Sequence, residues 1–196
     1  MSDPRQHTDE SQAALARRGI RWDAAAAIIA SLVGLLALVV AGYTAYIQRQ
    51  QVRAQVWPYL MWANSDNQQD YMWVNKGVGP AVVKSVQVLV GDKPQRNWNE
   101  VFRALRTGDL EHGQSSFNHT VVSASETLDW LQFKEHSDFL AFRHAAEQGK
   151  LSFKVCYCST LKDCWLDDTS RGSHGNNTRF DVGKCPAVPE SQQFDD

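Results

Sequence analysis

A block of 24 residues without a charged side chain, Ala24 to Ile47, most constrains what this chain can fold into. As a helix rising about 1.5 Å per residue it is roughly 36 Å long, enough to cross the hydrocarbon core of a bilayer. The apolar core of a cleaved signal peptide is shorter, at about 7 to 15 residues. A buried helix of a soluble protein would carry a polar stripe, whereas Ser31 is the one hydroxyl between Ala24 and Val40. The sequence therefore predicts an uncleaved transmembrane helix over residues 24–47.

Positive charge is unevenly placed around this helix. An excess of lysine and arginine marks the cytoplasmic side of a membrane span. Two arginines follow the span closely and four precede it: Arg49 and Arg53 after it, and Arg5, Arg17, Arg18 and Arg21 before it. We expect a single-pass, signal-anchor topology in which residues 1–23 form a cytoplasmic tail and the C-terminal part is exported. Aromatic residues flank the span as in interface belts: Trp22 on one side, and Tyr43, Tyr46, Trp57 and Tyr59 on the other.

The segment after the span predicts a short helical stalk, residues 48–57. It contains no helix breaker until the Trp57-Pro58 step, where proline disfavours helix in the residue before it. No Gly/Ser-rich linker follows, so we expect the exported domain to stay close to the membrane surface. Its working surface would then face the lipid bilayer or a membrane neighbour.

Residues 58–186 favour an antiparallel, immunoglobulin-like β-sandwich with two short helical insertions. The aromatic segments Tyr59 to Ala63 and Tyr71 to Asn75 predict a hairpin. A bend follows them at Asn75, Gly77, Gly79, Pro80 and Ala81. Period-two alternation then predicts a strand with Val82, Val86, Val88 and Val90 on its buried face, and Lys84 interrupting that face. Further strands are expected at 117–122, 127–133, 151–158 and 164–167, helices at 97–107 and 137–148, and a disordered tail at 187–196.

Some of these features resemble a family of small bacterial single-pass membrane proteins of uncharacterised function. They are the polar stalk that ends in Val56, Trp57 and Pro58, the Asn-x-Gly-x-Gly-Pro-Ala bend, and the Cys-Tyr-Cys…Cys-Trp stretch at 156–165. The resemblance covers most of residues 24–168 and implies a protein of the bacterial cell envelope. With the topology expected above, this places the anchor in the inner membrane and the domain in the periplasm or another extracytoplasmic space. The resemblance supplies no catalytic residues.

The four cysteines all lie in the part that this topology exports, where thiols usually pair. Three connectivities are open. The simplest joins Cys158 to Cys164 across a hairpin and Cys156 to Cys185, which closes a loop of about 30 residues worth roughly 3 to 4 kcal/mol. The alternative is a thiolate site for a soft metal such as copper, for which a Cys-x-Cys pair is suited.

The sequence offers no positive case for an enzyme or for a cofactor. The histidines at 112, 119, 136, 144 and 174 form no metal-binding spacing, and no phosphate-binding glycine loop occurs. Asp167 and Asp168 are interpreted as a solvated turn, and Ser173 beside His174 lacks the convergent geometry of a nucleophile and its base. A hydrolase would need Asp167, Asp168 and His174 to meet in a cleft.

The expected partners are the bilayer and another protein. The balance of 20 Lys+Arg against 22 Asp+Glu argues against nucleic acid. Trp62 and Trp73 are candidates for an exposed contact patch. Small residues at Ala30, Gly34, Ala37, Ala41 and Ala45 permit close helix packing, which leaves a homo-oligomer through the span open. The leading hypothesis is a non-catalytic accessory subunit or scaffold. The alternative is a sensor for a small envelope ligand, held between the sheet and the helix at 97–107.

Overall fold

The computed structural model describes residues 5–171 and 178–195, and side chains from Trp22 onward within those ranges. The chain divides into two compact units, one ending at Val52 and the other starting at Arg53. Helix α1 extends from Arg5 to Gln55. Most of it forms the first unit, and its last residues, from Arg53 onward, belong to the second. The second unit is a mainly-β domain.

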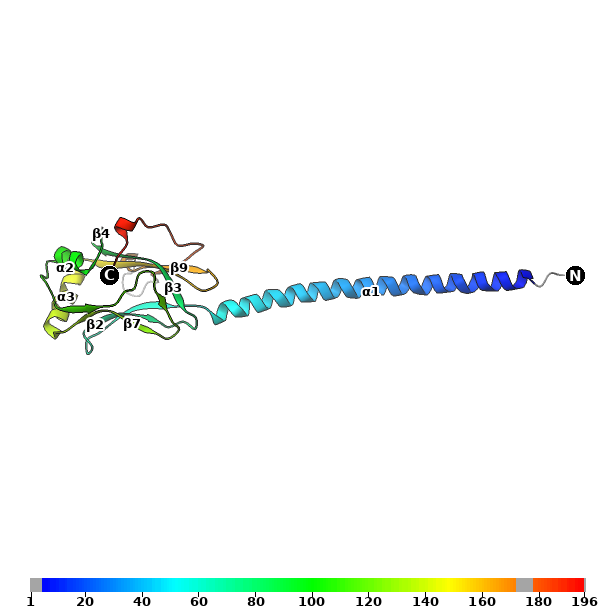
Figure 1. Cartoon of the computed structure of the whole chain (residues 1–196), viewed down its shortest axis with the longest axis horizontal. Helices are drawn as coiled ribbons and strands as arrows, with labels where there is room; N and C mark the ends of the chain where they lie inside the picture. The colour runs from blue at the N-terminus through cyan, green and yellow to red at the C-terminus, as the bar shows by residue number, and fades with distance from the viewer. Residues whose placement is uncertain (1–4, 172–177, 196) are drawn as a thin grey trace. The chain divides into compact units, whose positions relative to one another are not determined.

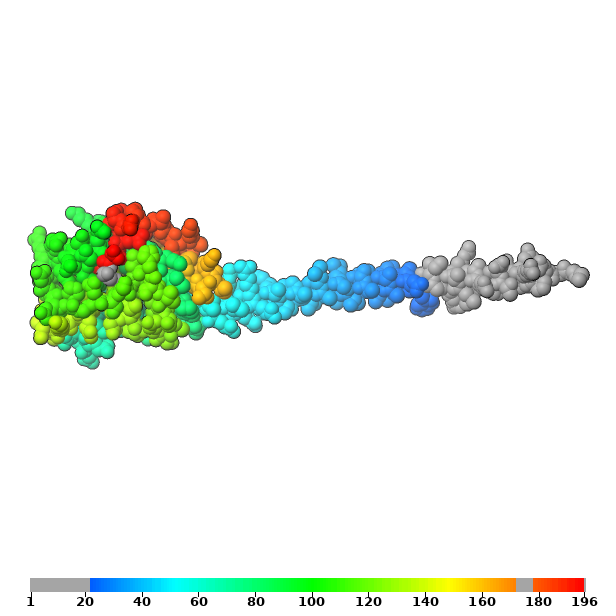
Figure 2. Space-filling view, viewed as in Figure 1, coloured from blue at the N-terminus to red at the C-terminus, as the bar shows by residue number. Residues whose placement is uncertain are grey.

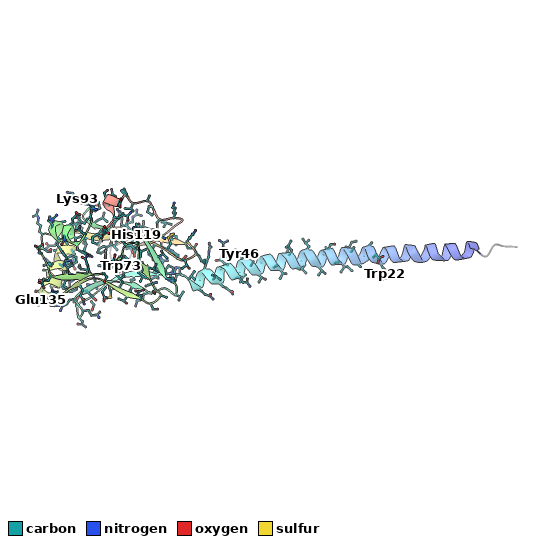
Figure 3. All side chains as sticks on the ribbon, in the orientation of Figure 1. Trp22, Tyr46, Trp73, Lys93, His119 and Glu135 are labelled. Atoms are coloured by element: carbon teal, nitrogen blue, oxygen red, sulfur yellow. A yellow bond between two sulfur atoms is a disulfide. The ribbon has the colours of Figure 1, made fainter. Side chains whose placement is uncertain are left out.

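Helix α1 includes both the apolar block and most of the polar N-terminal tail, which was expected only to precede the span. Between Trp22 and Gln55 it is long and apolar enough to cross a membrane, and it is the single such helix in the described part of the chain. Its apolar side chains are exposed, and Trp22 and Tyr46 project from its surface (Figure 3). Ser31 and Thr44 donate their hydroxyls to carbonyls one turn earlier, so neither hydroxyl requires water. The helix ends at Gln55, close to the predicted stalk end.

The β domain contains two antiparallel sheets. One has the strand order β1-β2-β7-β5, and the other has β10-β9-β8-β3-β4 with the short β6 paired to β3. Figure 1 shows β2 and β7 in one layer and β3 and β9 in the other. The strands are β1 Leu60–Ser65, β2 Asp70–Asn75, β3 Ala81–Val90, β4 Lys93–Gln95, β5 His112–Gln114, β6 Val121–Val122, β7 Thr127–Phe133, β8 Leu151–Cys158, β9 Cys164–Asp168 and β10 Arg179–Val182.

Aromatic side chains fill the space where the sheets face each other. Trp62 of β1 lies 4.4 Å from Phe153 of β8, measured between ring centroids, and Trp130 of β7 lies 5.4 Å from the same ring. Trp73 and Trp130 have no exposed surface. Burial of such large side chains is the main favourable term in the stability of a domain of this size.

The hairpin β1–β2 forms as predicted, with Trp62 opposite Trp73. The buried face predicted for β3 is wrong in its first half, because Val83 is buried while Val82 is only half-buried. The pairing with β8 shifts between Val83 and Ser85, so Lys84 is the extra residue of a β-bulge. A bulge exchanges the faces of the strand on either side of it.

Two helices cover one end of the layers: α2, Trp98–Leu105, and α3, His136–Gln148 (Figure 1). Asn97 caps α2 by accepting a hydrogen bond from the Glu100 backbone N–H, as its spacing predicts. The face of α2 that was expected to line a ligand site is buried in the core, at Trp98, Val101 and Phe102.

The C-terminal tail, expected to be disordered, packs onto the domain instead (Figure 2). The 3-10 turn Glu190–Gln192 precedes Phe194, which has no exposed surface and lies 5.1 Å from the ring of Trp98. The Phe194 N–H donates to the carbonyl of Val86. One aromatic residue in a polar segment gives no periodicity, so its core position could not be inferred from the sequence.

Candidate functional site

The start of the β domain is organised by one buried amide, that of Asn75. Its Oδ1 accepts hydrogen bonds from the backbone N–H groups of Tyr59 and Gly77, both at 3.0 Å. Its Nδ2 lies 2.8 Å from the Gly79 carbonyl and within 3.1 Å of two more, those of Val122 and Ser123. Asn75 thereby joins the end of β2, the bend after it, the strand β6 and the start of the domain.

The two glycines of the bend, Gly77 and Gly79, pack closely against the backbone of Val56 and Trp57. A Cβ atom on Gly77 would stand 2.4 Å from the Trp57 carbonyl oxygen, and one on Gly79 would stand 2.3 Å from the Val56 carbonyl. The Trp57 oxygen accepts hydrogen bonds from the N–H groups of Val78 and Gly79. The Val-Trp-Pro and Asn-x-Gly-x-Gly motifs, about 20 residues apart in the sequence, are therefore two halves of one junction.

An arginine reinforces this junction from the other sheet. The guanidinium of Arg179, on β10, lies over four aromatic rings at 4.7 to 5.9 Å from their centroids. Two of these rings, Trp57 and Tyr59, were expected to belong to a membrane-interface belt. Both rings contact Arg179 through cation–π interactions, together with Tyr157 and Trp165, and their place at a membrane interface stays a prediction.

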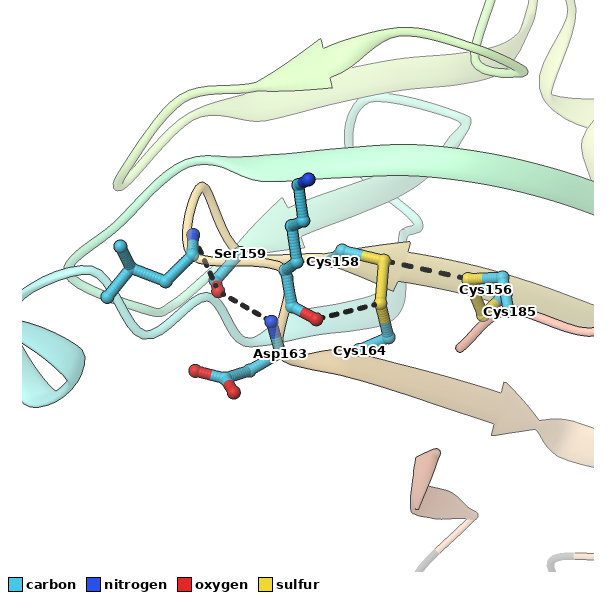
Figure 4. Close-up of a disulfide and its surroundings, with 8 residues drawn as sticks. Cys156, Cys158, Ser159, Asp163, Cys164 and Cys185 are labelled. Carbon is cyan, nitrogen blue, oxygen red and sulfur yellow. Dashed lines mark hydrogen bonds between the residues drawn. A yellow bond between two sulfur atoms is a disulfide. The ribbon is translucent and has the colours of Figure 1, made fainter. Parts of the chain in front are cut away.

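Two disulfides join the cysteines as the spacing predicts, Cys158 to Cys164 and Cys156 to Cys185. They lie side by side, with the sulfurs of Cys158 and Cys185 3.7 Å apart (Figure 4). The sulfurs of Cys158, Cys164 and Cys185 all lie within 4.8 Å of one another. A thiolate metal site there would require both disulfides to be reduced, because only a thiolate binds a soft metal strongly.

These disulfides form part of the wall of a pocket with a volume of about 770 Å³. The turn that closes the β8–β9 hairpin forms one side, and Ser159 holds it by accepting hydrogen bonds from the N–H groups of Leu161 and Asp163 (Figure 4). The segment around Pro186 forms another side. Three lysines also line it: Lys84, Lys162 and Lys184.

Of the residues that a hydrolase would require, the structure describes the two acids, and these do not share one face of their strand. Asp167 and Asp168 are both buried on β9, contrary to the expected solvated turn, and consecutive strand residues point to opposite faces. Asp168 forms ion pairs with Lys154 and Arg171. Burial raises the pKa of the Asp167 carboxyl, although a hydrogen bond from Thr178 opposes this shift. His174 and Ser173 lie outside the described residues.

Trp62 and Trp73 do not form the expected surface patch. Trp73 is fully buried, and Trp62 packs on Phe153 and Tyr71. Alternation of large aromatic and polar residues is typical both of a strand that faces the core and of one that forms a contact surface. The sequence therefore could not show whether these tryptophans are buried or exposed. Of the histidines whose side chains the structure describes, His112 lies on β5 and His119 in a turn, while His136 and His144 both lie on α3.

One buried acid was missed at the sequence level. Asp70, at the start of β2, is 1% exposed, and its Oδ1 atom has no hydrogen-bond partner in the described structure. Burial raises the pKa of this carboxyl, and the nearby charge of Asp129 raises it further. The sequence gives no signal for the burial of Asp70, since an acidic residue at the end of a polar run is typical of an exposed turn.

We expect Asp70→Asn to raise the melting temperature at pH 7. An acid whose pKa is higher in the folded state binds its proton more tightly there, so stability falls as pH rises from the unfolded pKa to the folded pKa. At pH 7 the charged form is destabilising, and the amide removes that charge. The gain should shrink as the pH falls toward 4. Thermal scans between pH 4 and pH 8 measure this, with exposed Asp92→Asn as the control; an Asp70→Asn gain independent of pH would contradict it.

The longer disulfide loop should contribute more to stability than the shorter one. The bond from Cys156 to Cys185 spans 29 residues and that from Cys158 to Cys164 spans six. In the chain-entropy model these loops are worth about 3.6 and about 2.2 kcal/mol. Urea unfolding of the full chain should therefore show a larger loss in the free energy of unfolding when Cys156 and Cys185 are changed to Ala than when Cys158 and Cys164 are. An equal or larger loss for the second pair would contradict this.

Comparisons with models of protein families, with curated proteins and with solved structures find no match for this chain.

Proposed function

We propose that this protein is anchored by α1 in the inner membrane of a bacterium, with its N-terminus in the cytoplasm and its β domain in the periplasm. We further propose that the domain is non-catalytic and binds another membrane or periplasmic protein as an accessory subunit or scaffold. The supporting observation is the Asn75 junction, which fixes the start of the domain without a flexible linker. An ordered start of the domain suits a docking module, because preorganisation lowers the entropic cost of association.

We propose that the domain is an immunoglobulin-like β-sandwich. Lettered in chain order, β1, β2, β5 and β7 correspond to strands A, B, D and E, and β3, β8 and β9 to C, F and G. The order β1-β2-β7-β5 is then A-B-E-D, and β3-β8-β9 is C-F-G, which are the two sheets of this fold. The disulfides depart from the usual pattern, since neither of them joins the two sheets.

The surface around the junction supports a protein-binding role. Val78, in the bend after β2, and Val121, on β6, are apolar residues that are 64% and 53% exposed. They are close in space, because the Asn75 amide contacts the carbonyls of Gly79 and Val122, the residues that follow them. Exposed apolar residues gathered beside the start of a domain are typical of an interaction surface.

Site-specific photocross-linking tests this function. A photoreactive residue at Val78 or Val121 of the full chain should yield one cross-linked protein from native membranes. The control position is Lys93, which is exposed and pairs with Val90 at the opposite end of β3. Equal cross-linking patterns from Val78 and Lys93, or none from either valine, would overturn the accessory-subunit proposal.

A second candidate function, a binding module for a small envelope ligand, is favoured by the disulfide pocket. Its volume of about 770 Å³ lies within the range of about 300 to 1,000 Å³ that is typical of small-molecule sites. This function predicts a saturable ligand effect on the melting temperature of the full chain in detergent. Substitutions in the pocket distinguish the two functions. If the domain is a ligand-binding module, they should abolish the ligand effect on the melting temperature and leave cross-linking at Val78 unchanged.

A further inference from the structure

The disulfide pocket combines two kinds of surface. Its walls are largely apolar: the Cys158–Cys164 bond, Cys185, and the side chains of Val82, Pro186 and Val188. Sulfur in a disulfide and aliphatic carbon offer few hydrogen bonds, so these walls suit a hydrocarbon portion of a ligand. The polar side chains of the pocket are three lysines together with Ser85, Ser159, Thr160 and Gln193.

The three lysines of the pocket come from three different segments. Lys84 is brought there by the β-bulge in β3, Lys162 lies in the β8–β9 turn, and Lys184 follows β10. All three are exposed, and none has a carboxylate partner among residues 5–171 and 178–195. The nearest acid in the turn, Asp163, is paired with Arg53 instead, at 3.4 Å. The pocket therefore offers uncompensated positive charge to a ligand.

The ion pair between Arg53 and Asp163 also bears on the source of that ligand. Arg53 is the first residue of the compact β unit, and only Gln48 to Val52 separate it from the end of the apolar block at Ile47. Lys162 is the residue next to Asp163. If α1 spans the membrane, as proposed above, the lipids of that membrane are the most concentrated amphiphiles within reach of this lysine.

We propose that the disulfide pocket binds an anionic phospholipid of the membrane in which α1 is anchored. The lysine ammonium groups would contact the phosphate, and the apolar walls would contact the glycerol backbone and the first part of an acyl chain. Lysine binds phosphate as a point charge, so three lysines on three segments suit a headgroup without demanding one fixed geometry. This inference rests on the proposed anchoring and deepens the second candidate function.

Titration of the full chain in a neutral detergent tests the proposal. The probes are dihexanoyl phosphatidylglycerol, dihexanoyl phosphatidylcholine and inorganic phosphate, with heat of binding as the readout. We expect the anionic lipid to bind at least tenfold more tightly than either of the other probes. The triple variant with Lys84, Lys162 and Lys184 changed to Gln should bind it about 100-fold more weakly, since each lysine contributes about a factor of five.

The matched control changes three exposed lysines outside the pocket, Lys76, Lys93 and Lys150, to Gln, and should leave binding within about twofold of the original. A melting temperature of the pocket variant equal to that of the original chain shows that its fold is intact. Equal binding of the two lipids, or equal losses in the two triple variants, would overturn the proposal. Phosphate binding as tightly as the anionic lipid would identify a site for a free anion instead.

The titration uses detergent and soluble lipids, so its result does not depend on whether α1 spans a membrane. The membrane-anchor proposal therefore needs a separate measurement. Alkaline carbonate extraction should leave the full chain in the membrane pellet if α1 spans the bilayer. A chain released by carbonate would overturn the anchoring while leaving the measured lipid preference intact. A chain retained in the pellet without any lipid preference would overturn the pocket proposal alone.

Discussion

Replacing Asn75 by Ala is expected to destabilise the β domain by at least about 3 kcal/mol. The variant leaves the buried N–H group of Gly77 and the part-buried N–H group of Tyr59 without their acceptor, and a buried unsatisfied group costs about 1 to 3 kcal/mol. Three carbonyls also lose their donor. Because a domain of this kind has a total stability of about 5 to 15 kcal/mol, the loss would be a large fraction of it. Urea unfolding of the full chain in detergent, followed by tryptophan fluorescence, measures it.

Asn64→Ala is the matched control for this substitution. Asn64 is an exposed asparagine on the neighbouring strand β1 of the same hairpin, so its loss should change the free energy of unfolding by no more than about 0.5 kcal/mol. If the Asn75 and Asn64 variants unfolded at the same urea concentration, the central role of the Asn75 amide in the junction would be wrong.

Gly79→Ala is expected to open the junction between stalk and domain. Its new Cβ would lie 2.3 Å from the Val56 backbone, which cannot move aside as a flexible side chain could. Overpacking of this kind costs about 1 to 3 kcal/mol, and more where the contact is with backbone. The last turn of α1, which contains the exposed Arg53, should then unwind more often. The rate of tryptic cleavage after Arg53 should rise by at least about tenfold, since cleavage follows the population of the open form.

Gly113→Ala provides the comparison, because a Cβ on Gly113 of β5 would meet nothing within 4 Å. Its cleavage rate at Arg53 should equal that of the original chain. Unchanged cleavage in the Gly79 variant, with the fold retained, would contradict the close contact between the bend and Val56.

Much of the architecture can be predicted from local patterns. The apolar helix follows from the length of one uncharged block, and the hairpin and β8 follow from period-two alternation. The end of α1 near Trp57 follows from proline chemistry. The disulfide pairing follows from the six-residue separation of Cys158 and Cys164, which a hairpin can close. All of these features depend on residues that are neighbours in the sequence.

The features that sequence reasoning missed depend on residues that are distant in the sequence. The bulge at Lys84 exists because β3 must pair with β8, about 70 residues later, and it changes which valine is buried. The burial of Phe194 depends on Trp98 and Val86 in the same way. The pocket requires the bulge, the β8–β9 turn and the segment after β10 to meet, so its lysines showed no common pattern in the sequence. The junction was visible only as two separate motifs whose contact could not be inferred.

The most direct test of the central claim, an exported domain closed by two disulfides on a membrane helix, is thiol labelling of the full chain in its native cells. Cells are quenched in acid to trap thiols, the protein is denatured, and a maleimide that adds mass is applied with or without prior reduction. We predict no adducts without reduction and four after it, because all four cysteines are paired. Four adducts without reduction would place the domain in a reducing compartment and contradict the claim.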